Sequence, residues 1–238
     1  MQRNLRGVKK RLLYVFVAFG VGSSLTWYYR KAIIALLLLP AHGQLSADGR
    51  PMFTGPTEVF SLVFRLVIQG GLVVAFPVAA YHIARFIGPL LTKQQRRFVA
   101  IFLSAGFVFY VLGVAFAYFV LVPTGLKFLL RFGADVAQPM VRIKEYMDIV
   151  LSMLFLLGVV FELPLAMFLL VKMRIVSYQR LKYLRRYSVA AAFILGAIIT
   201  PTFDPINQML VAVPLIFLYQ VGIFLAWTVR PREQRRGA

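Results

Sequence analysis

Residues 149–171 read IVLSMLFLLGVVFELPLAMFLLV, and Glu162 is their single ionisable side chain. A helix needs about 20 apolar residues, at about 1.5 Å each, to cross the roughly 30 Å hydrocarbon core of a bilayer. The stretch therefore predicts a transmembrane helix with Glu162 deep in the membrane. An ionisable group there costs on the order of 2.5–3.5 kcal/mol, which a polar partner, a water-filled cavity or protonation can offset. We interpret Glu162 as functional; the alternative is a neutral acid that is satisfied within its own bundle.

The composition of the chain indicates a membrane protein rather than a soluble domain. Of its 238 residues, 61% are hydrophobic, and the apolar segments leave almost no room for a folded soluble domain. The net charge of +19 does not indicate nucleic-acid binding, because the basic residues lie in short loops beside apolar segments. With no cysteine and only two separated histidines, His42 and His82, we expect no metal site and no cofactor. The first apolar run, from Leu12, predicts a retained helix rather than a removed signal peptide.

Apolar runs between charged breaks predict six transmembrane helices in one integral membrane domain over residues 1–238. The predicted spans are residues 12–29, 59–83, 98–122, 147–171, 187–200 and 208–229, followed by a basic tail at 230–238. A seventh run, residues 32–40, is too short to span and predicts an amphipathic or re-entrant piece at one surface. The fifth span, bounded by Arg186, reaches only about 20 Å as a helix. Because prolines predict kinks in other spans, the expected fold is an all-α, curved and open-sided bundle.

Lysine and arginine are concentrated in alternate connections between the predicted spans. The basic stretches are residues 3–11, 85–97, 172–186 and 230–236, whereas the other loops hold most of the acids. Cytoplasmic loops carry an excess of lysine and arginine. The sequence therefore predicts that both termini lie in the cytoplasm.

Short motifs follow one another along the predicted spans. In chain order they are Lys9-Lys10-Arg11-Leu12, Gly55-Pro56-Thr57-Glu58, Arg85-Phe86-Ile87-Gly88-Pro89, Arg96-Arg97, Ala115-Phe116-Ala117-Tyr118-Phe119, Pro123, Phe161-Glu162-Leu163-Pro164 and Thr200-Pro201-Thr202-Phe203-Asp204-Pro205, with Gln208 behind the last. In this order and topology they resemble the TatC family, the polytopic core of the twin-arginine protein translocase. The resemblance runs over nearly the whole chain.

The resemblance implies a six-helix, cupped protein of the bacterial cytoplasmic membrane, with short fifth and sixth helices, that exports folded proteins and is not an enzyme. Such a protein binds signal peptides with paired arginines on the cytoplasmic side. It recruits single-span partners of the TatA and TatB type, associates with further copies in a complex, and works in lipid on the proton-motive force.

The resemblance also assigns roles to residues of this chain. It implies signal-peptide binding for Lys9, Arg11, Phe86 and Gln95, partner-helix contact for Glu162, Thr200 and Gln208, and structural positions at the outer face for Pro40, Glu58 and Asp204.

Several of these residues have a second interpretation. Thr200 and Gln208 could equally form hydrogen bonds within the hairpin of the fifth and sixth helices. For Asp204 we favour capping of the sixth helix. Phe86 is either a recognition contact or an interfacial anchor.

Arg65 is the second charged side chain inside a predicted span. It lies about two helical turns from the outer end of residues 59–83. We favour snorkelling of its guanidinium to lipid headgroups, and the alternative is an ion pair with Glu58 at the outer end of the same helix.

The sequence departs from the family pattern at the residues expected to pair with signal arginines. Gly7 and Gln95 stand where the family usually has glutamates, and Gln220 replaces a third one in the sixth span. Glu233 is the only acid left on the predicted cytoplasmic face. Gln95 and backbone carbonyls could still accept hydrogen bonds from arginine, but bonds without charge assistance are roughly half as strong.

Three functional interpretations remain. The first is a twin-arginine translocase core with altered signal recognition, and the second is a TatC-like paralogue that scaffolds partner helices without reading twin arginines. An ion-coupled transporter that uses Glu162 as proton carrier is disfavoured, because Arg65 is the only other charged residue expected within the spans and away from their ends.

Overall fold

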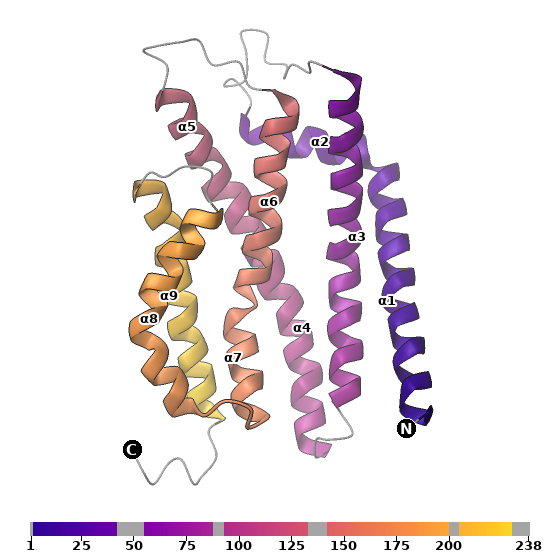
Figure 1. Cartoon of the computed structure of the whole chain (residues 1–238), viewed down its shortest axis with the longest axis vertical. Coiled ribbons are helices and arrows are strands. Elements are labelled where there is room, and N and C mark those ends of the chain that lie inside the picture. The colour runs from indigo at the N-terminus through magenta and orange to yellow at the C-terminus, as the bar shows by residue number, and fades with distance from the viewer. Residues whose placement is uncertain (1, 42–54, 88–92, 133–141, 200–204, 230–238) are drawn as a thin grey trace. The chain divides into compact units, whose positions relative to one another are not determined.

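The computed structural model describes residues 2–41, 55–87, 93–132, 142–199 and 205–229, and its regular elements are helices (Figure 1). In chain order they are α1 (Gln2–Tyr28), α2 (Arg30–Leu38), the 3₁₀ turn η1 (Leu39–Ala41), α3 (Pro56–Ile87), α4 (Lys93–Phe116), the π-helical turn η3 (Ala117–Leu121), α5 (Val122–Phe132), α6 (Ile143–Phe161), α7 (Leu163–Lys172), α8 (Tyr178–Ile199) and α9 (Pro205–Thr228). The predicted all-α class is confirmed.

The chain divides into two compact units. The first comprises Met1–Val108 and Gln138–Leu151, and the second comprises Phe109–Ala137 and Ser152–Ala238. The boundary passes through α4 and α6, so each of these helices contributes to both units.

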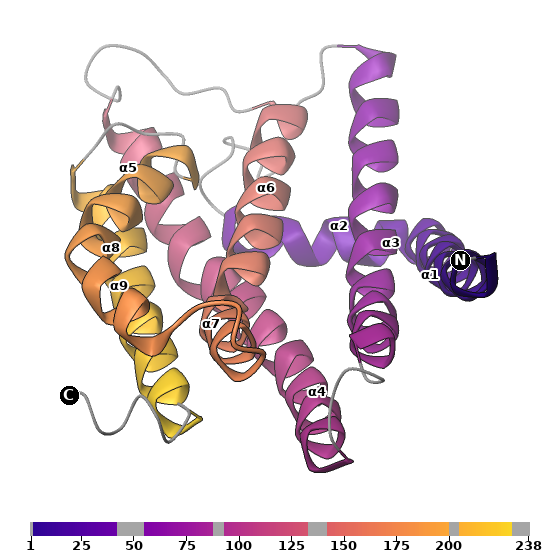
Figure 2. The ribbon, with the colours of Figure 1, turned by 60° about the horizontal axis from the view of Figure 1, so that its bottom comes forward.

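Four helical segments of the described chain are long and apolar enough to cross a membrane. They are Thr57–His82, Ala105–Phe128, Ile143–Lys172 and Gln208–Thr228. A fifth is counted if Lys9–Tyr28 and Arg30–Ala41, which meet at an angle of 72°, form one broken span. Figure 2 shows α2, which holds most of the short apolar run at residues 32–40, turning away from the end of α1. The chain is a multi-pass membrane protein, and the count of six spans remains a prediction.

The helix that contains the fifth predicted span is longer than that span. α8 begins at Tyr178, nine residues before the predicted start, and runs for 22 residues. Ser177 precedes it, and the Ser177 hydroxyl accepts a hydrogen bond from the backbone N–H of Arg180 at 3.3 Å, as a helix N-cap does. Arginine and lysine are good helix formers, so charge marks the end of the apolar segment but not the end of the helix.

Proline accounts for two interruptions in the long helices. Pro123 has no backbone N–H to bond the carbonyl of Phe119, and the π-helical turn Ala117–Leu121 lies immediately before it. Pro164 follows the break between α6 and α7, where it occupies the first turn of α7. Pro77 and Pro214, by contrast, lie inside α3 and α9 without a break in either helix.

Glycines let helices approach closely in the first unit. A Cβ on Gly22 of α1 would lie 2.6 Å from the Cβ of Val74 on α3, so the two helices are in direct contact there. Gly70 and Gly71 of α3 face Thr26 and Ser23 of α1 in the same way. Small residues at helix contacts are typical of membrane proteins, because close packing replaces the hydrophobic driving force in lipid.

Close packing of the same kind joins α4 to α6 in the second unit. A Cβ on Gly113 would lie 2.6 Å from the backbone oxygen of Leu157 and 2.9 Å from Phe161. A Cβ on Gly158 would meet the ring of Tyr110 at 2.6 Å. These contacts fix the end of α6, where Glu162 follows.

Candidate functional site

Glu162 lies at the break between α6 and α7. Its backbone N–H donates to the Val159 carbonyl at 3.1 Å, a tightened turn, and its carbonyl accepts from Ala166 at 2.9 Å to start the next helix. The break follows from Pro164, which cannot continue the hydrogen-bond ladder of α6. The local sequence therefore positions a carboxyl group at a bend within the candidate span Ile143–Lys172.

The Glu162 carboxyl is incompletely satisfied. Its Oε1 is buried, and no hydrogen-bond partner for it exists among the residues that the structure describes. The side chain as a whole is half-buried. A buried acceptor without a partner costs about 1–3 kcal/mol, so a donor brought from outside would be stabilising.

Rigid contacts surround this carboxyl on both sides of the break. The rings of Phe116 and Phe161 lie 5.8 Å apart, just before Glu162. Just after it, a Cβ on Gly222 of α9 would lie 3.2 Å from the Cα of Pro164. α4 and α9 therefore hold the break from two sides within the second unit.

Gln208 lies in the first turns of α9 and bonds to α8. Its side-chain amide donates to the Phe193 carbonyl at 2.8 Å, which is a hydrogen bond within the hairpin of these helices. Gly196 of α8 lies close by, since a Cβ there would be 3.1 Å from the Gln208 carbonyl. Thr200 and Asp204, the other polar residues expected near this hairpin, lie outside the described residues.

The residues expected to bind signal peptides lie on helices of the first unit. Lys9 is exposed on α1 and Arg11, two residues further, is half-buried on the same helix, which also contains Gly7. Phe86 lies in the last turn of α3 and Gln95 in the first turn of α4.

Ring stacking joins α1 to α3 near the same residues. The rings of Tyr14 and His82 are parallel within 4° at a centroid distance of 5.3 Å, and Tyr81 meets His82 edge-on at 5.4 Å. The sequence interpretation missed this cluster, because no spacing within one helix signals a ring stack between two helices.

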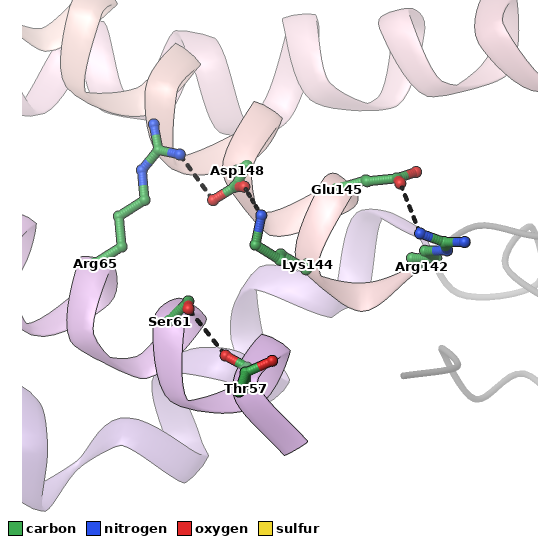
Figure 3. Close-up of polar contacts among 7 residues, drawn as sticks. All are labelled: Thr57, Ser61, Arg65, Arg142, Lys144, Glu145 and Asp148. Atoms are coloured by element: carbon green, nitrogen blue, oxygen red, sulfur yellow. Dashed lines mark hydrogen bonds and ion pairs between the residues drawn. The ribbon is translucent and has the colours of Figure 1, made fainter. Parts of the chain in front are cut away.

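A cluster of charges joins α3 to α6 in the first unit (Figure 3). The Arg65 guanidinium donates to Asp148 at 2.7 Å, and Lys144 donates to the other Asp148 oxygen at 3.3 Å. Arg142 and Glu145 form a longer ion pair of 3.7 Å one turn away. The sequence interpretation missed this pairing, because Asp148 lies 83 residues further along the chain. Snorkelling of Arg65 to lipid headgroups stays a prediction.

Glu58 and Pro40, both assigned to the outer face, lie near the ends of helices in this unit. Glu58 is in the first turn of α3, where a negative charge suits the helix dipole, and its N–H donates to the Gly55 carbonyl at 3.2 Å. Pro40 is in η1 after α2. The buried Tyr146 of α6 fixes α2 in place, because its hydroxyl donates to the Leu37 carbonyl at 2.6 Å.

The described residues contain no cluster of three metal ligands.

Comparison with known proteins identifies the family. The family model described as Sec-independent protein translocase protein (TatC) matches residues 3–214. The chain belongs to the TatC family. A Sec-independent protein translocase protein TatC of Carboxydothermus hydrogenoformans is 32% identical over 97% of this chain and 93% of its own length. The TatC of Deinococcus radiodurans is 36% identical over 99% of this chain and 89% of its own length.

A solved structure supports the same assignment at the level of the fold. The crystal structure of a twin-arginine translocase receptor TatC is similar with a TM-score of 0.78 at 32% identity, over 94% of this chain and 98% of that one. The protein is therefore a TatC-type core subunit of a Sec-independent protein translocase, a transport component rather than an enzyme. The resemblance read from the motifs is confirmed.

Proposed function

We propose that this TatC protein binds signal peptides of folded cargo and nucleates assembly of single-span partner subunits of the TatA and TatB type. It does so in the bacterial cytoplasmic membrane with both termini in the cytoplasm, and transport is driven by the proton-motive force. The observation that carries the proposal is the buried carboxyl oxygen of Glu162, which has no partner among the described residues and lies at a break within a candidate span. This oxygen can accept a hydrogen bond from a partner helix within the membrane.

The partner-helix role of Glu162 follows from the cost of an unsatisfied hydrogen-bonding group in lipid. A partner helix that brings a donor satisfies a group which the described chain leaves unsatisfied. Hydrogen bonds between membrane helices average about 0.6 kcal/mol, which corresponds to about a threefold change in affinity. Glu162 therefore fixes the register of the partner more than its affinity, with Thr200 and Gln208 as further contacts on the α8–α9 hairpin.

Substitution of Glu162 tests this role through partner association. In Glu162→Ala, we expect about threefold weaker co-purification of a TatA- or TatB-type subunit, with normal membrane insertion because the insertion cost of the acid is also removed. Glu145→Ala is a matched control, since Glu145 is an exposed acid on the same helix. Unchanged co-purification of Glu162→Ala would refute the role.

Signal recognition is proposed at the ends of α1, α3 and α4 that contain Lys9, Arg11, Phe86 and Gln95. Gly7 and Gln95 leave this surface without the usual glutamates, which favours a second candidate, a TatC-like scaffold that does not read twin arginines. The two candidates differ in whether binding depends on the arginines of the peptide.

Photo-crosslinking separates the two candidates. A photo-crosslinker is placed at residue 86 or 95. The protein in membranes is then incubated with a twin-arginine signal peptide or with the same peptide carrying paired lysines. A crosslinker at Lys31, which is exposed on α2, is the control position. Crosslinks that form at residues 86 and 95 but not at residue 31, and only with the twin-arginine peptide, support the receptor. Crosslinks that form equally with both peptides support the scaffold.

A further inference from the structure

The N-terminal half of α8 carries a dense group of cations, Arg180, Lys182, Arg185 and Arg186, which we name the basic patch. All four side chains are exposed. No acidic residue occurs in the sequence between Glu162 and Asp204. Within the described part of the chain, none of the four forms an ion pair. Their charge is therefore available to an external anion.

Packing on the opposite side of α8 holds the basic patch in place. Leu181 is 6% exposed and belongs to a buried cluster with Met167, Val171 and Ala226. The Tyr219 hydroxyl of α9 donates to the Leu181 carbonyl at 2.9 Å. α8 and α9 accordingly run side by side in both views of the second unit (Figures 1 and 2). The cations thus project from a fixed helix rather than from a loop.

Two exposed tyrosines lie among the cations. The Arg186 guanidinium lies 4.1 Å from the ring centre of Tyr183 and 4.7 Å from that of Tyr187, and it also donates to the Tyr183 hydroxyl. The rings are 59% and 52% exposed. Tyrosine is enriched where the lipid headgroups meet the hydrocarbon core. A guanidinium stacked on such rings lies at the level of the lipid phosphates.

The length of α8 places the patch at the same depth. Beyond Ser188 the helix is apolar to its end, and Ile194 and Ile198 are 62% and 67% exposed, as lipid-facing residues are. From Lys182 to Arg186 the helix rises about 6 Å, which matches the about 5–7 Å of one headgroup layer, and the long side chain of Arg180, about 3 Å further out, can reach the same layer. The cations therefore occupy the headgroup layer when the apolar half of α8 lies in the hydrocarbon core.

We propose that the basic patch is a binding site for anionic phospholipid headgroups, which anchor the fifth membrane helix by their phosphates. Charge complementarity selects this occupant, since guanidinium groups bind phosphate with paired hydrogen bonds. Each lysine or arginine near an anionic surface contributes about a fivefold change in partition at moderate salt. The site adds a lipid-specific anchor to a helix whose apolar part is too short to hold its own position.

Tryptophan fluorescence offers a local test, because Trp227 lies on α9 next to Ala226 of the Leu181 cluster and is 45% exposed. The chain has two tryptophans, so Trp27→Phe leaves Trp227 as the only reporter. The purified protein is placed in vesicles of mixed phosphatidylcholine and phosphatidylglycerol. Bromine, which quenches tryptophan on contact, is carried by the acyl chains of one lipid or of the other.

The expected result is stronger quenching of Trp227 by brominated phosphatidylglycerol than by brominated phosphatidylcholine. In Arg185→Gln/Arg186→Gln, the relative affinity for the anionic lipid should fall about fivefold or more, by loss of two phosphate contacts. Lys10→Gln/Lys31→Gln removes the same charge from exposed residues of the first unit and should leave the preference unchanged.

Three results would overturn the proposal. The first is equal quenching by both lipids in the parent protein, and the second is an equal loss of preference in the two double variants. The third is displacement of the lipid preference by excess soluble poly-glutamate, which would assign the patch to an acidic protein segment. Arg185→Lys/Arg186→Lys retains both charges and is the control for misfolding. It should keep more of the preference for the anionic lipid than the glutamine variant does.

Discussion

Gly113→Ala tests the contact that holds the end of α6 next to Glu162. A Cβ on Gly113 would lie 2.6 Å from the Leu157 carbonyl oxygen, whereas ordinary contacts of this kind are 3.4–4 Å. The oxygen belongs to the backbone of α6 and has no rotamer by which to move. α4 and α6 must therefore separate by about 0.8 Å, from 2.6 to 3.4 Å, before the methyl group fits.

The expected loss of stability combines two opposing effects. Overpacking of a close contact costs about 1–3 kcal/mol. Replacement of glycine by alanine inside a helix stabilises the helix by about 0.5–1 kcal/mol. We expect Gly113→Ala to lower the free energy of unfolding by about 1 kcal/mol, within a range of about 0–2.5 kcal/mol, as the sum of these effects.

Reversible unfolding in mixed micelles, followed by circular dichroism, measures the effect. Gly125→Ala on α5 is the matched control, because its nearest contact would be the Met153 methyl at 3.9 Å and the change should therefore be neutral or stabilising. The difference between the two variants isolates the packing cost, since the helix propensity is common to both. Equal stability of the two variants would refute the close approach of α4 to α6.

Three further predictions concern single contacts. Asp148→Asn removes the carboxylate that Arg65 and Lys144 share, and should lower the unfolding free energy by about 1 kcal/mol at low salt and less at high salt, since this pair is partly exposed. Tyr146→Phe leaves the Leu37 carbonyl without its buried donor and should cost about 1–2 kcal/mol in the same assay; no change would contradict the hydrogen bond. Arg174→Gly should raise stability by about 1 kcal/mol, because Arg174 has a positive φ of 61° at the end of α7, and a loss of stability would show that its side chain matters more than its backbone.

The candidate site was predictable from the sequence where its signal is local. The apolar run around Glu162 predicted an acid within a span, and the proline two residues later predicted a kink, where the structure has a break between two helices. The start of α8 was not predictable from hydropathy, because Tyr178 to Arg186 form helix without being apolar. Nor was the π-helical turn before Pro123, since proline can be accommodated by a kink, a break or a bulge.

The sequence by itself determined the class of the protein, the helical spans that are strongly apolar, the acid inside the fourth span and the family. Each of these depends on residues close together in the chain, whose period and charge act before any tertiary contact forms. Only the tertiary structure decided that Arg65 pairs with Asp148, that Gln208 bonds to Phe193, and that Gly113 meets Leu157. Such contacts depend on which faces of two helices meet, and in lipid that choice is made by close packing and hydrogen bonding rather than by hydrophobicity, which is similar on every face.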